Sequence, residues 1–254
     1  MEVHAHTHTV PIAIGRKKWT HYLWEFLMLF LAVFCGFLAE NKREHIVERQ
    51  REKKYMVSLV NELMADTAQI RELLTDSTWI KGQDSLMNIL YNTSPVSIDT
   101  RLVYYFYEEY TVYINSAILN NNTLTQLKNS GSMRLIRNKD VIDSLYLLNT
   151  IIVAVDKQFD LFLYHTYPQY SAMSARIINE KYLMNSKPGQ LRQHLFSLSE
   201  KPELITYSPA ALVEFANYIG RIKKTRTRYI DILRYYYNYC ISLIPFIKKE
   251  YHLK

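Results

Sequence analysis

The sequence is short of the residues that break or crosslink a polypeptide chain. Its 254 residues include six glycines and seven prolines, so few turns and long regular elements are expected. It has only two cysteines, Cys35 and Cys240, which lie far apart in the chain. A fold held together by intramolecular disulfides is therefore not expected.

Motifs of the common enzyme and metal-binding classes are absent as well. The sequence has no HExxH or CxxC, and His165, His194 and His252 do not have the spacing of metal ligands. The segment NSGSMR around Gly131 lacks the second glycine and the Lys-Ser/Thr of a phosphate-binding loop. We accordingly assign no catalytic residue, no cofactor and no metal site, and we expect a protein without enzymatic activity.

Three alternating histidines, His4, His6 and His8, lie in the N-terminal tail, residues 1–18. In an extended chain their imidazoles would project to one side, and imidazoles bind Zn²⁺, Ni²⁺ and Cu²⁺. No carboxylate or cysteine completes a structural site with them. We therefore predict a disordered tail with incidental metal affinity.

An apolar run followed at once by charged residues is the strongest signal in the chain. Residues 21–39, HYLWEFLMLFLAVFCGFLA, contain one formally charged side chain, whereas residues 40–54 contain ten. At ~1.5 Å per residue the run would extend ~28 Å, close to the ~30 Å core of a bilayer. No small-x-small cleavage pattern follows, so we predict an uncleaved transmembrane helix over residues 19–39. Its aromatic anchor residues are Trp19, Tyr22, Trp24, Phe26, Phe30, Phe34 and Phe37.

Glu25 is the carboxylate of this anchor. It lies about one turn inside the predicted span, where it can reach the interface or meet Lys17, Lys18 or His21. The alternative is a proton or ion site shared with a partner span, because carboxylates inside membranes are frequently functional. In that case the protein would be an ion-coupling subunit.

The charges on either side of the span give two opposing indications of orientation. Three Lys/Arg residues precede it and six follow it up to Lys54, and the larger count is expected on the cytoplasmic side. This count favours a cytoplasmic C-terminal part. An Arg-Lys-Lys before a first span is also typical of a signal-anchor, which would export that part.

Helical periodicity continues beyond the span. We predict one continuous helix from Trp19 to about Thr75, in which residues 40–76 are a charged juxtamembrane helix. Shorter helices are expected from Ser77 to Tyr91, from Asp99 to Leu119 and from Thr123 to Asn129. The juxtamembrane helix has apolar positions in a heptad-like pattern, at Met56, Leu59, Leu63, Thr67, Ile70 and Leu74.

Two further long helices are predicted, from Asp140 to about Ile178 and from Pro209 to about Lys249. Together with the first long helix they predict an all-α protein, in which the transmembrane and juxtamembrane helix is followed by an antiparallel helical bundle over residues 77–254. The same seams could instead pair between chains. The first apolar stripe is Val141, Leu145, Leu148, Ile152, Val155, Phe159 and Phe162, and the second is Leu212, Phe215, Ile219, Ile222, Arg226, Tyr229, Leu233, Tyr237, Cys240 and Ile244.

Two groups of polar residues could bind a ligand. Glu108 and Glu109 lie among the tyrosines of the segment 104–110, but adjacent helical residues point about 100° apart, so a surface position is expected.

A basic run before a group of tyrosines is compatible with nucleic-acid binding. Because the basic residues share a helix with an apolar seam, we expect them to face solvent or lipid headgroups, and we expect no nucleic-acid partner. The alternative is a surface that binds phosphate or acidic groups. The basic residues are Arg221, Lys223, Lys224, Arg226 and Arg228.

Two segments carry a resemblance to a known group of proteins. They are KKWTHYLWEFLMLFLAVFCGFLAENKREHIVERQREKKYMVSLVNEL, residues 17–63, and TLTQLKNSGSMRLIRNKDVIDSLY, residues 123–146. In these the chain resembles an uncharacterised family of bacterial single-span membrane proteins with a domain of unknown function. The resemblance covers about a quarter of the chain and implies a helical protein of the bacterial plasma membrane. It implies no activity.

Two functions of different classes follow from these patterns. The first is a membrane-anchored helical scaffold or accessory subunit, whose partners would be the lipid bilayer and a second copy of the chain or another membrane protein. The second is a ligand-binding or enzymatic domain with a buried site formed by the tyrosines of residues 104–110, Glu108, Glu109 and Arg226. A polar pocket uniting these residues would favour the second.

Overall fold

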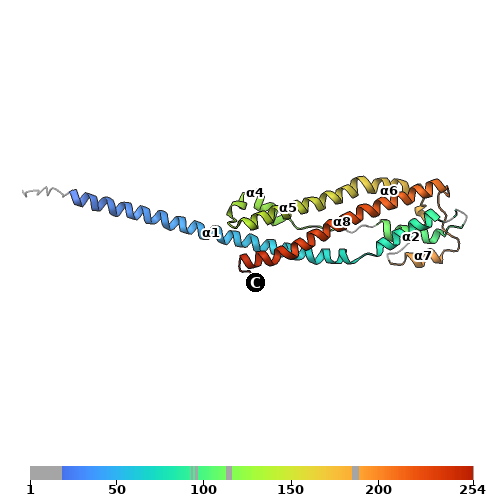
Figure 1. Cartoon of the computed structure of the whole chain (residues 1–254), viewed down its shortest axis with the longest axis horizontal. Coiled ribbons are helices and arrows are strands. Elements are labelled where there is room, and N and C mark those ends of the chain that lie inside the picture. The colour runs from blue at the N-terminus through green and yellow to red at the C-terminus, as the bar shows by residue number, and fades with distance from the viewer. Residues whose placement is uncertain (1–18, 93, 95–96, 113–115, 185–188, 254) are drawn as a thin grey trace, which may run out of the picture. The chain divides into compact units, whose positions relative to one another are not determined.

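The computed structural model describes residues 19–92, 94, 97–112, 116–184 and 189–253. Within these ranges the protein is all-α and contains no strand, which confirms the predicted fold class (Figure 1). The chain divides into two compact units, Met1–Arg51 and Glu52–Lys254. The helices are α1 (Trp19–Thr75), α2 (Thr78–Asn92), α3 (Thr100–Tyr107), η1 (Glu108–Val112), α4 (Asn122–Asn129), η2 (Ser132–Leu135), α5 (Lys139–Asp160), η3 (Leu161–Thr166), α6 (Tyr167–Ser174), η4 (Glu180–Tyr182), α7 (Leu191–Ser197) and α8 (Pro209–Glu250).

The helix α1 has the bounds that the sequence predicts, and its heptad-like positions from Met56 to Ile70 are buried within the second unit, whereas Leu74 is half-buried. Met56, Leu59, Leu63 and Ile70 are at most 1% exposed. The turn after α4 contains Gly131, which adopts a φ of 66°, in the left-handed region that glycine tolerates.

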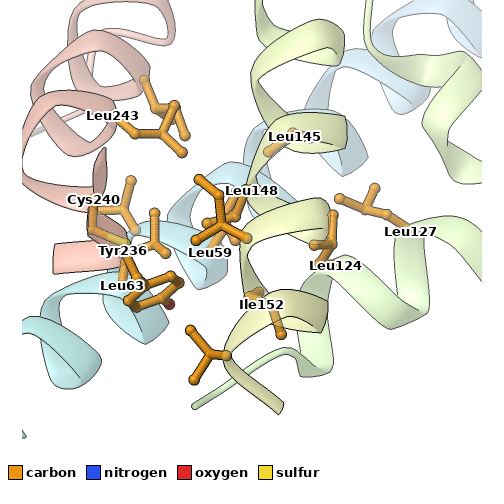
Figure 2. Packing of buried hydrophobic residues seen from close by; sticks show 14 of the residues in the cluster. Leu59, Leu63, Leu124, Leu127, Leu145, Leu148, Ile152, Tyr236, Cys240 and Leu243 are labelled. Carbon is orange, nitrogen blue, oxygen red and sulfur yellow. The ribbon is translucent and has the colours of Figure 1, made fainter. Parts of the chain in front are cut away.

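The helix α8 runs through both hydrophobic cores of the second unit. Its C-terminal half packs with the end of α1, with α4 and with α5, and Figure 2 shows Leu59, Leu148 and Cys240 meeting there. Its N-terminal half packs with α2, α3, α6 and α7. Arg226 lies on α8 between the two groups of buried residues, which end at Ile222 and begin again at Tyr229.

The predicted seam of α8 is wrong near its end. Tyr236 and Leu243 are buried there, whereas Tyr237 and Ile244 are only half-buried. The prediction placed two four-residue steps in succession after Tyr229, but the buried positions keep the strict alternation of three and four residues. The hydroxyl of Tyr236 also finds a buried hydrogen-bond acceptor, which favours its inward position.

The long helix predicted from Asp140 to Ile178 is interrupted. The α-helical geometry of α5 gives way to the π-helical turn η3, and α6 then ends at Ser174. Pro168 explains the interruption, because it has no N–H to donate and its ring crowds the carbonyl four residues earlier. The predicted apolar stripe is confirmed from Val141 to Val155, and Phe162 is buried as well.

The helix predicted from Asp99 to Leu119 is too long. Helical structure ends at Val112, residues 113–115 lie outside the described residues, and residues 116–121 are not helical. Long-range hydrogen bonds take the place of helical ones in this segment. The N–H of Ala117 donates to the Tyr229 hydroxyl at 2.9 Å, and the N–H of Asn120 donates to the Asp66 carboxylate at 3.0 Å.

Candidate functional site

The segment predicted to span a membrane is a helix with exposed apolar side chains. It contains an 18-residue window with a mean hydropathy of 2.0, none of which is buried within the protein. The rings of Phe26, Phe30 and Phe34 follow one another along the helix, with centroid separations of 6.2 and 5.8 Å. In the described part of the chain this is one helix that is long and apolar enough to cross a bilayer.

Glu25 and His21 lie one helical turn apart on this segment and interact. The His21 Nε2 is 3.0 Å from the Glu25 Oε1, and both side chains are about half exposed. The sequence predicted this pairing as one of the ways to accommodate a carboxylate near the end of the span.

His4, His6 and His8 of the tail lie outside the described residues. No group of three or more potential metal ligands occurs in the described part of the chain.

Three carboxylates on one side of α1 bind segments that come from elsewhere in the second unit. Asp66 is fully buried and accepts hydrogen bonds from the backbone N–H of Asn120 at 3.0 Å, from its side-chain amide at 2.6 Å and from the Tyr236 hydroxyl at 2.6 Å. Burial raises the pKa of Asp66, and these hydrogen bonds oppose the rise. All of its partners are donors, so the carboxylate serves as a structural acceptor.

Glu62 and Glu52 act in the same way at two other positions. Glu62 accepts hydrogen bonds from the Thr123 N–H at 3.1 Å and from the Thr123 hydroxyl at 2.8 Å. It therefore provides an acceptor for a backbone N–H in the first turn of α4, whose own N-cap residue makes no side-chain hydrogen bond. Glu52 accepts from the Tyr251 hydroxyl at 2.6 Å and from the N–H of Arg137 at 3.3 Å. These polar contacts join α1 to segments that are distant in the sequence.

The tyrosines of residues 104–110 also have structural partners. The Tyr104 hydroxyl donates to the carbonyl of Glu203 at 2.8 Å and accepts from the N–H of Asn179 at 2.8 Å. The Tyr107 hydroxyl lies 3.3 Å from the Ser174 Oγ and 3.2 Å from the Glu180 Oε1. These bonds connect α3 to the end of α6 and to the segments that follow it.

The two glutamates beside these tyrosines do not form a pair. Glu108 is half-buried, and burial, with smaller contributions from Glu180 and Glu109, raises its pKa. Glu109 is exposed. Arg226, the third member of the buried site that the sequence allowed, stacks on the ring of Trp79 of α2.

Arg226 is not part of the predicted basic surface. It is 8% exposed, and its guanidinium carbon lies 4.3 Å from the ring centroid of Trp79 on α2. Burial lowers its pKa to about 10, and the more distant Asp76 carboxylate opposes this shift. An arginine is accommodated in the seam because its planar group stacks on an aromatic face and its methylene chain packs among apolar neighbours.

The other four predicted basic residues gather around a groove between α2 and α8. The groove has a volume of about 790 Å³. Lys223 forms an ion pair with Asp84 of α2, and Arg221 lies over the ring of Tyr218 at 5.2 Å from its centroid. The residues that line it are Met87, Tyr91, Asn217, Gly220, Arg221, Lys223, Lys224, Thr227 and Arg228. This groove brings the four exposed basic residues of the run together with residues of α2.

Comparisons of this chain with protein-family models, with curated proteins and with solved structures find no match. The class of the protein is consequently defined by its own features, namely an exposed apolar helix and an all-α unit.

The sequence reasoning missed the three carboxylates of α1. Glu62 and Asp66 lie next to seam positions, since Glu62 precedes Leu63 and Asp66 precedes Thr67, and Glu52 lies four residues before Met56. A charged residue beside an apolar seam is normally solvated, so this signal does not identify a buried acceptor.

Proposed function

We propose that this chain is a single-pass protein of the bacterial plasma membrane that acts as a helical scaffold or accessory subunit. Its unit Glu52–Lys254 would contact protein partners from the cytoplasmic side. The observation that carries the proposal is the exposed apolar segment of α1, because such a surface is unfavourable in water and is stabilised by a bilayer. The six Lys/Arg residues that follow the span support the cytoplasmic side.

A second observation supports contacts with other proteins. Large apolar side chains lie on the exposed side of α5 and η3, where they do not contribute to either core. Several large apolar side chains exposed on one side of a helix are typical of interaction sites. We call these residues the α5 stripe, and they are Tyr146, Leu147, Val153, Leu161 and Tyr164. The partner is either a second copy of the chain or another membrane protein.

The orientation can be measured by labelling an introduced cysteine. Ser199 is exposed, and replacing it by cysteine gives a site for a membrane-impermeant maleimide. In spheroplasts we expect no labelling of Ser199→Cys, and full labelling after permeabilisation. The parent protein is the matched control, because Cys240 is buried and Cys35 lies in the span, where lipid shields it from the reagent.

Labelling in intact spheroplasts would place the C-terminal unit outside the cell and contradict the proposed side. Recovery of the parent protein in the soluble fraction after membranes are washed at high pH would contradict the anchor itself.

Crosslinking in native membranes tests the contacts. We expect an amine-reactive reagent to yield a product at about twice the 30.1 kDa chain mass for a homo-oligomer, or a distinct larger product for another membrane protein. Replacing Leu147 and Val153 by aspartate should abolish the product, since desolvating two new carboxylates opposes association. The matched control replaces two exposed apolar residues elsewhere, Ile205 and Val213, by aspartate and should leave the product unchanged. A chain that remains monomeric in membranes would contradict the scaffold role.

A further inference from the structure

The groove between α2 and α8 has a charge that the rest of the second unit does not neutralise. Lys224 and Arg228 line it, and no carboxylate lies within ion-pairing distance of either in the described residues. No acidic residue is among the described residues that line the groove. Arg221, Lys224 and Arg228 are three and four residues apart on α8, so they project from the same side of the helix and repel one another.

The shape of the groove separates it from an ordinary basic surface. Its volume of about 790 Å³ is within the range of small-molecule sites. Met87 and Tyr91 of α2 form an apolar wall opposite the cations, and the Tyr91 hydroxyl donates to the Asn217 Oδ1 across the groove at 2.8 Å. The groove therefore offers cations and an apolar wall within one recess.

Gly220 leaves this recess open. It lies in the interior of α8 and lines the groove. A β-carbon placed on it would meet only the Met87 sulfur, at an ordinary van der Waals distance of 3.6 Å. Packing against neighbouring residues therefore does not require glycine at this position. Glycine is also unfavourable in the interior of a helix. A larger side chain at this position would fill the groove without displacing the backbone.

We propose that this groove binds an organic phosphate. The phosphate would be held by Arg221, Lys224 and Arg228, since guanidinium and ammonium groups form charge-assisted hydrogen bonds with phosphate oxygens. The organic part of the ligand would pack against Met87 and Tyr91. This site is independent of the proposed scaffold role.

A nucleic-acid strand fits the groove less well than a small phosphate does. Binding of single strands uses a series of aromatic side chains on which successive bases stack. Among the tyrosines that follow the basic run, Tyr229 and Tyr236 are 2% and 0% exposed, and the exposed Tyr235 does not line the groove. Tyr91 is the tyrosine that lines the groove.

The test uses the full chain in phosphatidylcholine nanodiscs, with inorganic pyrophosphate as the probe and calorimetry as the measurement at low salt. We expect binding that weakens by about tenfold or more when Lys224 and Arg228 are both replaced by glutamine, because two charged contacts are lost. Gly220→Leu should weaken it similarly while every charge is kept. The matched control replaces Lys139 and Lys157, two exposed lysines of α5, by glutamine and should bind as the parent does.

A parallel series with phosphatidic acid in the nanodiscs distinguishes the source of the phosphate. Binding of pyrophosphate indicates a soluble ligand, and groove-dependent enrichment of phosphatidic acid alone indicates a lipid headgroup. Absence of both overturns the proposal. Binding that survives the groove variants, or that falls equally in the α5 control, overturns it too, because the site would then be general surface charge. Melting curves by circular dichroism check that each variant is folded.

Discussion

Replacing Asp66 by alanine is expected to lower the free energy of unfolding by about 3–5 kcal/mol, because three hydrogen-bond donors lose their acceptor inside the protein. These donors are the backbone N–H and side-chain amide of Asn120 and the hydroxyl of Tyr236. Asp66 itself is 0% exposed, so water cannot replace the carboxylate without a rearrangement of the core. The measurement is urea denaturation of the full chain in a mild detergent, followed by circular dichroism.

Two controls identify the cause of this loss. Asp231→Ala makes the same chemical change on α8, where the Asp231–Arg234 pair is exposed, and it should alter the free energy of unfolding by less than about 0.5 kcal/mol. Tyr236→Phe removes one of the three donors and should cost about 1 kcal/mol. An Asp66→Ala variant as stable as the Asp231→Ala variant would contradict the assignment of Asp66 as a structural acceptor.

Gly82→Ala and Gly220→Ala, the same substitution in two helix interiors, are expected to change stability in opposite directions. A β-carbon on Gly82 would overlap the ring of Tyr110, and the backbone of Tyr110 is held near α2 because the Gln83 side-chain amide donates to its carbonyl at 2.9 Å. We expect Gly82→Ala to destabilise the protein by about 1–3 kcal/mol through overpacking. Gly220→Ala meets no such obstacle and should stabilise it by about 0.5–1 kcal/mol, the usual gain in a helix.

The difference in melting temperature between these two variants checks the packing between α2 and η1. If both raise the melting temperature, the contact between Gly82 and Tyr110 is not as close as described. If Gly82→Ala lowers the melting temperature as expected, combining it with Tyr110→Ala should relieve the clash, so the two substitutions should cost less together than the sum of their separate effects.

The features of the fold that follow from periodicity could be predicted from the sequence. The apolar stripe from Val141 to Val155 and the bounds of α1 depend on neighbours within a few residues, and local patterns record these. The non-helical path of residues 116–121 could not be predicted in this way. Its hydrogen bonds include one between Asn120 and Asp66, which are 54 residues apart, and Asp66 is also bound by Tyr236, which is 170 residues away.

The candidate site was predictable in its charge but not in its composition. The basic run on α8 could be seen in the sequence, yet the sequence does not place Trp79 over Arg226, and so it does not remove Arg226 from the surface. It also does not place Met87 and Tyr91 of α2 opposite Lys224 and Arg228. Both arrangements arise from the packing of α2 on α8, which is a long-range contact that helical periodicity does not specify.

The carboxylates of Glu52, Glu62 and Asp66 have a consequence for the axial position of α1. A helix that packs only through leucine and isoleucine at heptad positions can slide by one heptad and bury similar side chains again. Such a shift would here separate three acceptors from their donors at once, and the donors belong to different segments of the chain. The polar contacts therefore specify a single axial position of α1 against its neighbours. The apolar seam alone would allow several such positions.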